Sequence, residues 1–540
     1  MVARFRRQAE GRGVNAEAGL KNDAEGGAAA AGRSERFALN VFWNWLGVGV
    51  SLCAGLLLSP YLIRRLGPDG YGVWALSFSM VEYYWLLDLG FRAAVVKYVA
   101  HYWTTGENDK IAEVINTGLF YSAAVAGVIM LVIGLAAFHL DRFFQVAPAF
   151  RGQFPILIVL ISTSWCLGSI FNIFGGCLDA VQRFDLSTRA SIVSTAVRTF
   201  GTAAVLYFSR SLIAIGLMTA FSQIVMYVLN YLMFRRLFRG QSISFRHASR
   251  SMLRTMGGFG IHAFLTNIGN QISTQSPPVL IGHYQPARFV GYYNLPVKLL
   301  QYTVELVART GLVTNSNAAE LAARNDRTAL SRLAVFPNRY CLVMFMPMAV
   351  FLAIFGDQLF QLWVGAAFAA QSAPILPVLL AGSVIAHVGQ FSSTMLLQGL
   401  ARNQQYARGL LAEALIGIVL MIWAIPRYGI LGGAVAASVL MILNRAVYVS
   451  WLTSRVVRMP FWSYVTEIYF YPFAAAVPAV LLLWWIRSSV FTQAGWLSLA
   501  TAGLIAGLSY YPVAWFTCLA PQDRLMARGI LTSRLAARFS

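Results

Sequence analysis

Residues 113–138 read EVINTGLFYSAAVAGVIMLVIGLAAF, an almost wholly apolar stretch that is long enough to cross a bilayer as one helix. Thirteen further stretches of similar length and character run from about residue 38 to residue 519 and leave little chain for a water-soluble domain. Of the 540 residues, 58% are hydrophobic and 12% are charged, whereas about a quarter of a soluble protein is usually charged. The sequence therefore predicts an all-α integral membrane protein with about 14 transmembrane helices.

The predicted spans divide the chain into two similar halves and a shorter end. An N-terminal six-helix lobe is predicted over residues 38–236, with helices near 38–62, 71–90, 113–138, 154–178, 186–208 and 211–234. A C-terminal six-helix lobe is predicted over residues 256–455, with helices near 256–281, 289–308, 340–356, 373–398, 409–425 and 429–453. Two extra helices, 13 and 14, near 464–486 and 494–518, lie within residues 456–519. Helix two is expected to continue toward Ala100, because residues 91–100 stay rich in Ala and Val.

The segments outside the spans carry much of the positive charge. Residues 1–37 predict a disordered basic tail, residues 237–255 a basic linker between the lobes, and residues 520–540 a second tail. The formal net charge is +21, but the Lys and Arg residues are sorted by loop rather than gathered on one soluble face. Such a positive-inside bias predicts that both termini lie in the cytoplasm, and it argues against a nucleic-acid partner.

A repeat links the two predicted lobes. The run GYGVWAL at residues 70–76 is matched by GYYNL at residues 291–295. A second pair, LDAVQRF at 178–184 and LARNQQY at 400–406, lies at almost the same separation along the chain. Nearly constant offsets are typical of a duplicated unit. Six spans is an even number, so both copies enter the membrane in the same sense, and such parallel repeats commonly enclose a site near the bilayer midplane.

Four short runs resemble motifs of bacterial polysaccharide and O-antigen flippases. They are LIRRLGPDGYG at 62–72, LDLG at 87–90, LWVG at 362–365 and YGILGGA at 428–434. The chain is similar to the polysaccharide transporter branch of the multidrug, oligosaccharidyl-lipid and polysaccharide exporter superfamily over nearly its whole length from residue 38. The resemblance implies two lobes around a V-shaped central cavity in the bacterial inner membrane. It also implies export of undecaprenyl-pyrophosphate-linked oligosaccharide for surface or secreted polysaccharide, with a polymerase and chain-length proteins as candidate partners.

A lipid-linked glycan needs a polar path, because each sugar hydroxyl that loses its hydrogen bonds costs roughly 2 to 7 kcal/mol. Its pyrophosphate needs cations on that path. Lys298, Arg198 and Arg445 lie within predicted spans, where a charge is costly unless it faces a cavity or a partner. For all three, a structural ion pair or a side chain that reaches back to the interface is the competing interpretation.

Two further cations, Arg92 and Lys97, lie near the inner end of helix two and could receive the pyrophosphate on entry. Asp88 precedes Arg92 by four residues, so a salt bridge within the helix is at least as good an explanation for Arg92. Both interpretations stay open.

Candidate residues for coupling transport to a proton or Na⁺ are the acidic side chains within the spans: Glu82, Asp88, Glu305 and Glu413. Glu305 also has the spacing for a structural pair with Arg309. Asn267 and Asn270 could bond sugar hydroxyls or hold helices together. Many relatives of the family carry an acidic residue late in helix seven, where this chain reads QSPP at 275–278, and that departure argues against a simple carboxylate-coupled mechanism there.

Two other classes of function fit the sequence less well. A cation-coupled multidrug exporter of the same fold should show carboxylates in its pocket and normally needs only twelve spans. A membrane-embedded glycosyltransferase or polymerase generally needs catalytic carboxylates in sizeable outer loops, and the predicted outer loops are short. No metal site or cofactor is expected, since the Cys and His residues show no paired ligand spacing and no phosphate-binding loop motif is present. The sequence thus favours a transporter that works by alternating access and performs no chemistry.

Overall fold

The computed structural model describes residues 2–84, 91–308, 321, 324, 326–386, 391–400, 402–491, 493, 495–520 and 523–525, with side chains from residue 42 onward except at 141, 259–263, 265 and 403. Every regular element within these ranges is a helix. Ten helices in them are long and apolar enough to cross a membrane. The predicted all-α membrane fold is therefore confirmed, whereas the count of fourteen spans stays a prediction.

The N-terminal half consists of seven helices with short 3-10 turns between some of them. They are α1 (Val2–Glu82), α2 (Phe91–Thr105), α3 (Asn108–Ala136), α4 (Leu140–Phe143), α5 (Gln153–Ala180), α6 (Phe184–Phe208) and α7 (Leu212–Leu237). α1 is broken at Gly67, whose φ of +72° suits a residue without a Cβ atom, so α1 holds the first predicted span and the start of the second. α2 runs to Thr105, slightly past the predicted extension.

The predicted tail coincides with the first part of α1, which begins at Val2. Because side chains are described only from residue 42, the role of that tail at the membrane stays a prediction.

The C-terminal half begins at α8 and is longer. Its helices are α8 (Arg250–Tyr284), α9 (Arg288–Ala308), α11 (Arg327–Val364), α12 (Ala366–Ser372), α13 (Ile375–Ala386), α14 (Phe391–Gly399), α15 (Asn403–Met441), the π-helical η7 (Ile442–Val449), α16 (Ser450–Val457), α17 (Phe461–Ser489) and α18 (Trp496–Thr517). α15 is broken at Gly429, with a φ of +63°, between the predicted eleventh and twelfth spans. α11 begins at Arg327, well before the predicted start at residue 340, so the predicted boundary was wrong.

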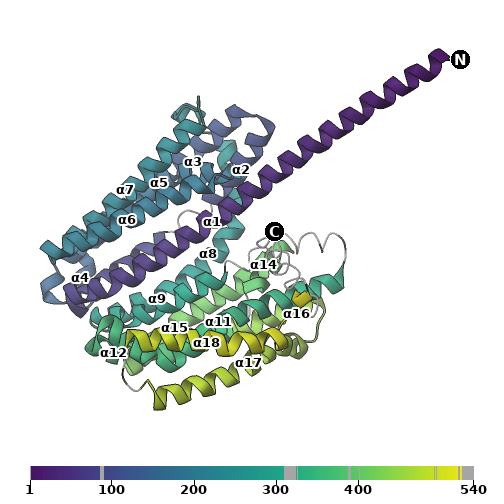
Figure 1. The fold of residues 1–540 in the computed structure, drawn as a ribbon. Coiled ribbons are helices and arrows are strands. Elements are labelled where there is room, and N and C mark those ends of the chain that lie inside the picture. The colour runs from purple at the N-terminus through teal and green to yellow at the C-terminus, as the bar shows by residue number, and fades with distance from the viewer. Residues whose placement is uncertain are drawn as a thin grey trace.

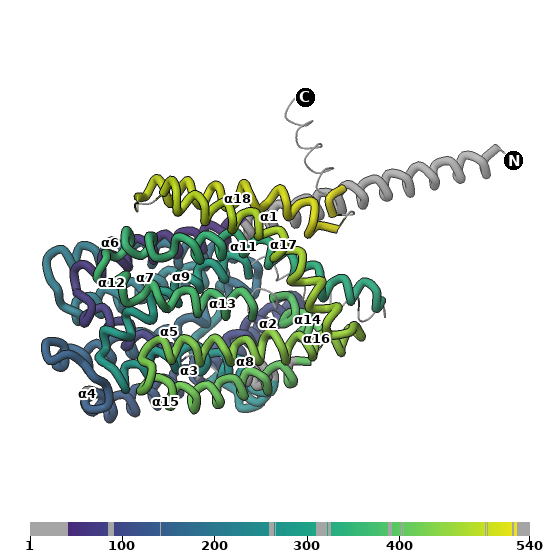
Figure 2. Tube along the Cα trace, turned by 90° about the horizontal axis from the view of Figure 1, so that it is seen from below, coloured from purple at the N-terminus to yellow at the C-terminus, as the bar shows by residue number. Residues whose placement is uncertain are grey.

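The two halves form two groups of helices (Figure 1). α2, α3, α5, α6 and α7 lie together on one side, and α11, α15, α17 and α18 lie together on the other. α8 packs against both groups, since it contacts α15 as well as α2 and α3. Seen from below, α17 and α18 lie at the side of the α11 and α13 helices (Figure 2). We call the end that carries α4 and α12 the outer end, following the predicted topology.

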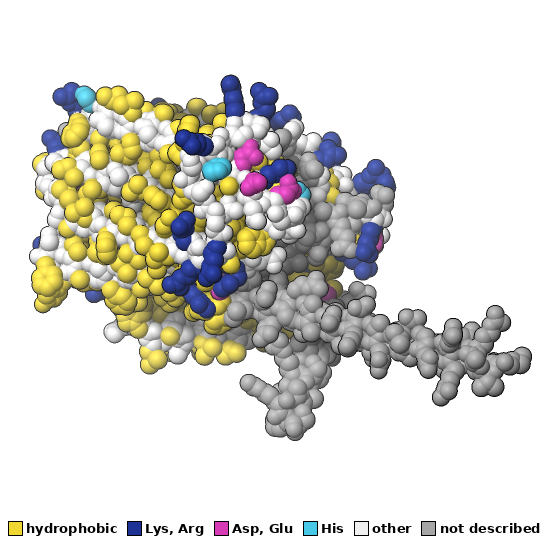
Figure 3. Space-filling model, turned by 90° about the horizontal axis from the view of Figure 1, so that it is seen from above, with side chains coloured by type: hydrophobic (Ala, Val, Ile, Leu, Met, Phe, Trp, Pro, Cys, Tyr) yellow, Lys and Arg dark blue, Asp and Glu magenta, His cyan; other side chains and the backbone are white. Residues whose placement is uncertain are grey.

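The surface agrees with a membrane environment. In Figure 3, hydrophobic side chains cover much of the left and middle of the view, and Lys and Arg side chains gather in clusters near its middle and towards the right. Val128, Leu131 and Leu135 of α3 are among the exposed apolar residues, each more than half exposed. A water-soluble surface would not carry so continuous an apolar cover, which fits contact with lipid.

Main-chain hydrogen bonds join the two halves at the outer end. The Gln145 N–H donates to the Gly282 carbonyl at 3.1 Å, and the Ala287 N–H donates to the Gln145 carbonyl at 3.0 Å. Gly72 lies so close to this hairpin that a Cβ atom there would be 2.0 Å from the carbonyl oxygen of Ala287. Gly72 and Gly291 come from the repeated motifs and contact each other. The repeated segments therefore meet where the outer end is closed.

The third helix of the N-terminal half anchors the chain that leaves that half. Asn116 of α3 donates from Nδ2 to the carbonyl of Ala112 at 2.8 Å and to that of Ser242 at 2.9 Å. Its Oδ1 accepts the Ser244 N–H at 2.9 Å. One amide side chain thus fixes the linker that leads into α8.

The same device recurs in the C-terminal half, at the separation that relates the second pair of repeated motifs. Asn338 of α11 donates to the carbonyl of Ala334 at 2.9 Å and to the hydroxyl of Tyr464 at 3.3 Å. Its Oδ1 accepts the Ser392 N–H at 2.9 Å. Tyr464 lies just beyond the second half, as Ser242 lies just beyond the first. Ser242 and Tyr464 are separated by the same number of residues as Asn116 and Asn338. The two asparagines thus lie at matching positions of the predicted repeat and each bonds the chain beyond its own half, whereas their Oδ1 partners, Ser244 and Ser392, do not correspond.

Candidate functional site

Two charged side chains, one from each end of the N-terminal half, lie within electrostatic range of Lys298 in the C-terminal half. Glu82 lies at the end of α1, Arg198 lies within α6, and Lys298 lies within α9. Lys298 is an electrostatic neighbour of both Glu82 and Arg198. All three are half-buried, and each belongs to a segment that the sequence predicts to be within the membrane. We call Glu82, Arg198 and Lys298 the junction triad.

Polar side chains hold Glu82 of the triad in place. The Gln275 side-chain amide donates to its carboxylate, and the Gln271 Nε2 donates to its main-chain carbonyl at 2.9 Å. Both glutamines come from α8, the helix that contacts both groups. The QSPP run, which lacks the acidic residue of many relatives, thus supplies an amide that bonds a carboxylate on α1.

Tyr302 forms the other side of the triad. It lies one turn beyond Lys298 on α9 and is an electrostatic neighbour of Arg198. Its hydroxyl occupies the space in front of Gly55 of α1, where a Cβ atom would come within 2.1 Å of it. Gly55 therefore allows α9 to approach α1 closely at this level.

The triad has a formal charge of +1, since it contains two cations and one carboxylate. Among the described residues, Glu82 is the one carboxylate that acts on Lys298. A buried cation in excess is costly in a low-dielectric region, and such intramembrane charges usually serve a function. The arrangement suits an anionic group that enters between the halves, and Lys298 and Arg198 provide donors for its oxygens.

Arg92 lies apart from the triad, in a salt bridge with Asp179 of α5. The Nη2–Oδ2 distance is 2.9 Å, and the side chains of Arg92 and Asp179 are 41% and 15% exposed. Ser187 also donates to this carboxylate at 2.7 Å. The alternative partner, Asp88, lies outside the described residues. Arg92 is therefore paired, but with a different helix from the one that the sequence suggested.

Lys97 is exposed on α2, and its ammonium group lies 5.2 Å from the centre of the Tyr98 ring. The structure does not bring it to the junction triad. Its predicted role at the entrance stays a prediction.

Arg445 and Glu413 form a buried ion pair within the C-terminal half. Arg445 Nη2 is 3.2 Å from Glu413 Oε1, and the side chains are 11% and 5% exposed. The Asn444 amide donates to the same carboxylate at 2.6 Å. Both Asn444 and Arg445 lie on the π-helical segment η7, whose wider turn brings consecutive residues to one side. The competing interpretation of Arg445, a structural ion pair, agrees with this geometry.

The other candidates lie at more exposed positions. Asn267 and Asn270 of α8 are exposed, and their predicted contacts with sugar stay untested. Glu305 is exposed on α9 and is an electrostatic neighbour of Tyr302, while its proposed partner Arg309 lies outside the described ranges. Within those ranges there is no group of three or more His, Cys, Asp or Glu side chains that could hold a metal ion.

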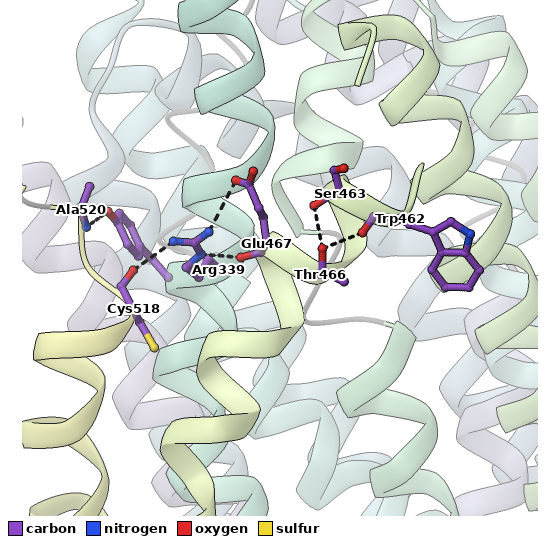
Figure 4. Close-up of polar contacts among 8 residues, drawn as sticks. Arg339, Trp462, Ser463, Thr466, Glu467, Cys518 and Ala520 are labelled. Atoms are coloured by element: carbon purple, nitrogen blue, oxygen red, sulfur yellow. Dashed lines mark hydrogen bonds and ion pairs between the residues drawn. The ribbon is translucent and has the colours of Figure 1, made fainter. Parts of the chain in front are cut away.

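Arg339 is a buried charge that the sequence analysis missed, because it was assigned to a loop. It lies in α11 and is 7% exposed. Its Nε donates to the Glu467 carbonyl at 2.6 Å, and its Nη1 donates to the Cys518 carbonyl at 3.4 Å (Figure 4). Its guanidinium lies 4.8 Å from the centre of the Tyr471 ring. Arg339 therefore ties α17 and the end of α18 to the C-terminal half.

Sequence comparison gives a family match over half of the chain. Residues 37–312 match the family model described as "Polysaccharide biosynthesis protein". A Shigella flexneri protein named as an O-antigen transporter is 19% identical over 77% of this chain and 97% of its own length. The membrane protein EpsK of Bacillus subtilis is 19% identical over 91% of this chain and 97% of its own.

Structural comparison finds transporters of the predicted superfamily. "Lipid II flippase MurJ, inward closed conformation" superposes with a TM-score of 0.69 at 14% identity, covering 89% of this chain and 98% of that one. An inward-facing multidrug resistance MATE transporter of the MOP superfamily has a TM-score of 0.61 at 12% identity, covering 76% of this chain and 99% of that one. The predicted transporter-type fold is confirmed.

Proposed function

Because the chain belongs to the family of polysaccharide biosynthesis proteins matched over residues 37–312, we propose that it is a flippase for polyprenyl-pyrophosphate-linked oligosaccharide repeat units. It moves these units across the bacterial inner membrane for surface or secreted polysaccharide, with both termini in the cytoplasm. It performs no reaction on its substrate. The similarity to an O-antigen transporter and the fold shared with a lipid II flippase support this proposal.

The junction triad is the observation that carries the proposal. Lys298 and Arg198 outnumber the Glu82 carboxylate, so the junction between the halves favours an anion. In the proposed cycle, the pyrophosphate bonds these two cations while the glycan passes between the halves. Main-chain hydrogen bonds join the two halves at the outer end, so the substrate would enter from the inner end. This arrangement corresponds to the inward state of alternating access.

Part of the driving force is electrical in this account. The pyrophosphate carries about two net negative charges, and outward movement of each one down an inside-negative potential yields roughly 2.3 kcal/mol per 100 mV. Glu82, held by Gln275 next to Lys298, is the best placed of the acidic candidates to respond to an ion. Glu413 is less suited to that role, because Arg445 and Asn444 already neutralise and bond it.

A cation-coupled multidrug exporter is the second candidate, because MATE transporters share the fold. Cationic drugs need excess carboxylates at the site, and the junction triad has an excess of positive charge instead. A polysaccharide polymerase and chain-length proteins are proposed as partners that receive the exported unit, because a flippase must deliver its product to them.

Translocation in liposomes tests the proposed function. The purified protein is reconstituted, and transport of a fluorescent undecaprenyl-pyrophosphate oligosaccharide is compared with transport of a panel of cationic dyes, with and without an imposed potential. We expect the glycan to be flipped, faster with an inside-negative potential. Dye transport without glycan flipping would instead assign the chain to multidrug export.

A further inference from the structure

A separate cavity lies inside the N-terminal half, away from the junction triad. The empty space in it, its open mouth included, is about 730 Å³. It is lined by residues of α2, α3, α5 and α7 and by Tyr84, just beyond α1. Apolar walls with a few polar groups, as here, are typical of small-molecule sites. Neither the family match nor the relatives' names assign a role to this cavity.

One face of α5 forms the wall of this cavity. Trp165, Ser169 and Asn172 recur at intervals of four and three residues, so they lie on the same side of the helix. Gln223 faces them from α7. The Asn172 and Gln223 amides have no hydrogen bonds to other described residues, and each offers donors and an acceptor.

Hydroxyl groups add to this set of donors and acceptors. The Tyr84 hydroxyl accepts a hydrogen bond from Ser162 at 3.3 Å, so its own proton can be donated to a ligand. The Ser169 hydroxyl donates to the Cys166 carbonyl at 2.8 Å, so its oxygen can accept. At the inner end of the cavity, Arg92 Nε is buried and has no hydrogen-bond partner among the described residues.

The charge of the cavity indicates the class of ligand. Among the described residues of its lining, Arg92 is the cation, and its guanidinium is already paired with Asp179 at 2.9 Å, so the net charge of these residues is close to zero. An anion would have to compete with that carboxylate. A neutral polyol instead matches free amides and hydroxyls, and the faces of Trp165 and Tyr84 suit the apolar C–H face of a sugar ring.

We propose that this cavity is a binding site for a neutral sugar residue. The inference rests on the proposed function, and it deepens it: the junction triad holds the pyrophosphate, and the N-terminal half selects part of the glycan. Asn172 and Gln223 would determine which hydroxyl pattern is accepted, because an amide that faces the wrong sugar is left without its hydrogen bonds.

Binding of free sugars to the purified protein is the test. Glucose, galactose, mannose and N-acetylglucosamine are titrated by calorimetry and by tryptophan fluorescence, with glucuronate as an anionic comparison. At least one neutral sugar should bind saturably. Asn172→Leu and Gln223→Leu should each weaken that binding about threefold to tenfold, and Trp165→Phe should remove the fluorescence change. Gln371→Leu, the same change as Gln223→Leu at an exposed position of α12, should leave binding unaltered.

Three outcomes would overturn the proposal. They are the absence of binding by every neutral sugar, binding unaffected by both leucine variants in protein that elutes and melts like the wild type, and binding of glucuronate at least tenfold tighter than any neutral sugar. The flippase function is judged separately. If the wild type flips the lipid-linked glycan in liposomes while no sugar binds, the function stands and the cavity has no role in it. If the wild type flips nothing, the proposed function fails whatever the titrations give.

Discussion

Each half has an asparagine anchor, but the two halves bury their charges differently. Asn116 and Asn338 lie at equivalent positions of the predicted repeat, and each donates a hydrogen bond to the chain beyond its own half. The next residue differs: Thr117 accepts the Ser249 N–H in the first half, whereas Arg339 binds two carbonyls and the extra helices in the second. The first half has a half-exposed salt bridge between Arg92 and Asp179, and the second has a buried one between Arg445 and Glu413. We therefore expect the buried contacts of the C-terminal half to contribute more to stability than the half-exposed pair of the N-terminal half.

The largest effect is expected from the buried pair of the C-terminal half. Arg445→Met leaves the Glu413 carboxylate buried without its cation, which should lower the free energy of unfolding by about 3–5 kcal/mol. Denaturant titration in detergent micelles measures this change. The double variant Glu413→Leu with Arg445→Met should recover most of the loss, because no charge is then left alone. If the double variant is as unstable as Arg445→Met, the unpaired Glu413 carboxylate is not the cause of the lost stability.

A smaller loss is expected at Arg339. Arg339→Met removes the hydrogen bonds to α17 and to the end of α18, and hydrogen bonds from charged groups contribute about 1.5–3 kcal/mol each. Limited proteolysis should then cut the chain between α16 and α17 faster. Thr117→Val, at the equivalent position of the first half, should cost less. Equal losses at the two positions would contradict the asymmetry between the halves.

The two anchors should respond alike. Asn116→Ala and Asn338→Ala each remove the acceptor of a main-chain N–H, part-buried at Ser244 and buried at Ser392, so each should lower the free energy of unfolding by about 1–3 kcal/mol. The same titration measures both. A loss at one position and none at the other would mean that the repeated contact is a coincidence of geometry.

The smallest effect is expected at the salt bridge of the N-terminal half. Arg92→Met breaks a pair in which the arginine is 41% exposed, and such pairs contribute about 0–1 kcal/mol. Stability should therefore hardly change. If Arg92→Met lowered the free energy of unfolding as much as Arg445→Met, the two salt bridges would contribute equally to stability. The contrast between the two halves would then be wrong.

Several features could be predicted from the sequence because they depend on composition and local pattern. The apolar stretches predict the helical membrane fold, the motif at residues 70–76 predicts the repeat, and hydropathy selects Lys298 and Arg198 as unusual charges. The approach of Lys298 to Glu82 and to Arg198 could not be predicted, because it depends on how α1, α6 and α9 pack. The salt bridge of Arg92 with Asp179 could not be predicted either, because the two residues are 87 positions apart in the chain.

Arg339 shows a second limit. It lies just before the span predicted to start at residue 340, yet α11 continues through it. A polar residue in a long membrane helix resembles a loop residue in the sequence when its hydrogen-bond partners lie on helices that are distant in the chain. The partners of Arg339 lie on α17 and just after α18. The cavity beside Trp165 was missed for the same reason, because its lining comes from separate helices.

The central claim is that the cations of the junction triad hold the pyrophosphate during transport. The most direct test measures the rate of flipping of a fluorescent undecaprenyl-pyrophosphate oligosaccharide by the wild type, by Lys298→Gln and by the matched surface variant Lys110→Gln, all reconstituted at equal density. We expect Lys298→Gln to be at least tenfold slower, because a charge-assisted bond to the pyrophosphate is lost, and Lys110→Gln to match the wild type. A wild-type rate in Lys298→Gln would contradict the account.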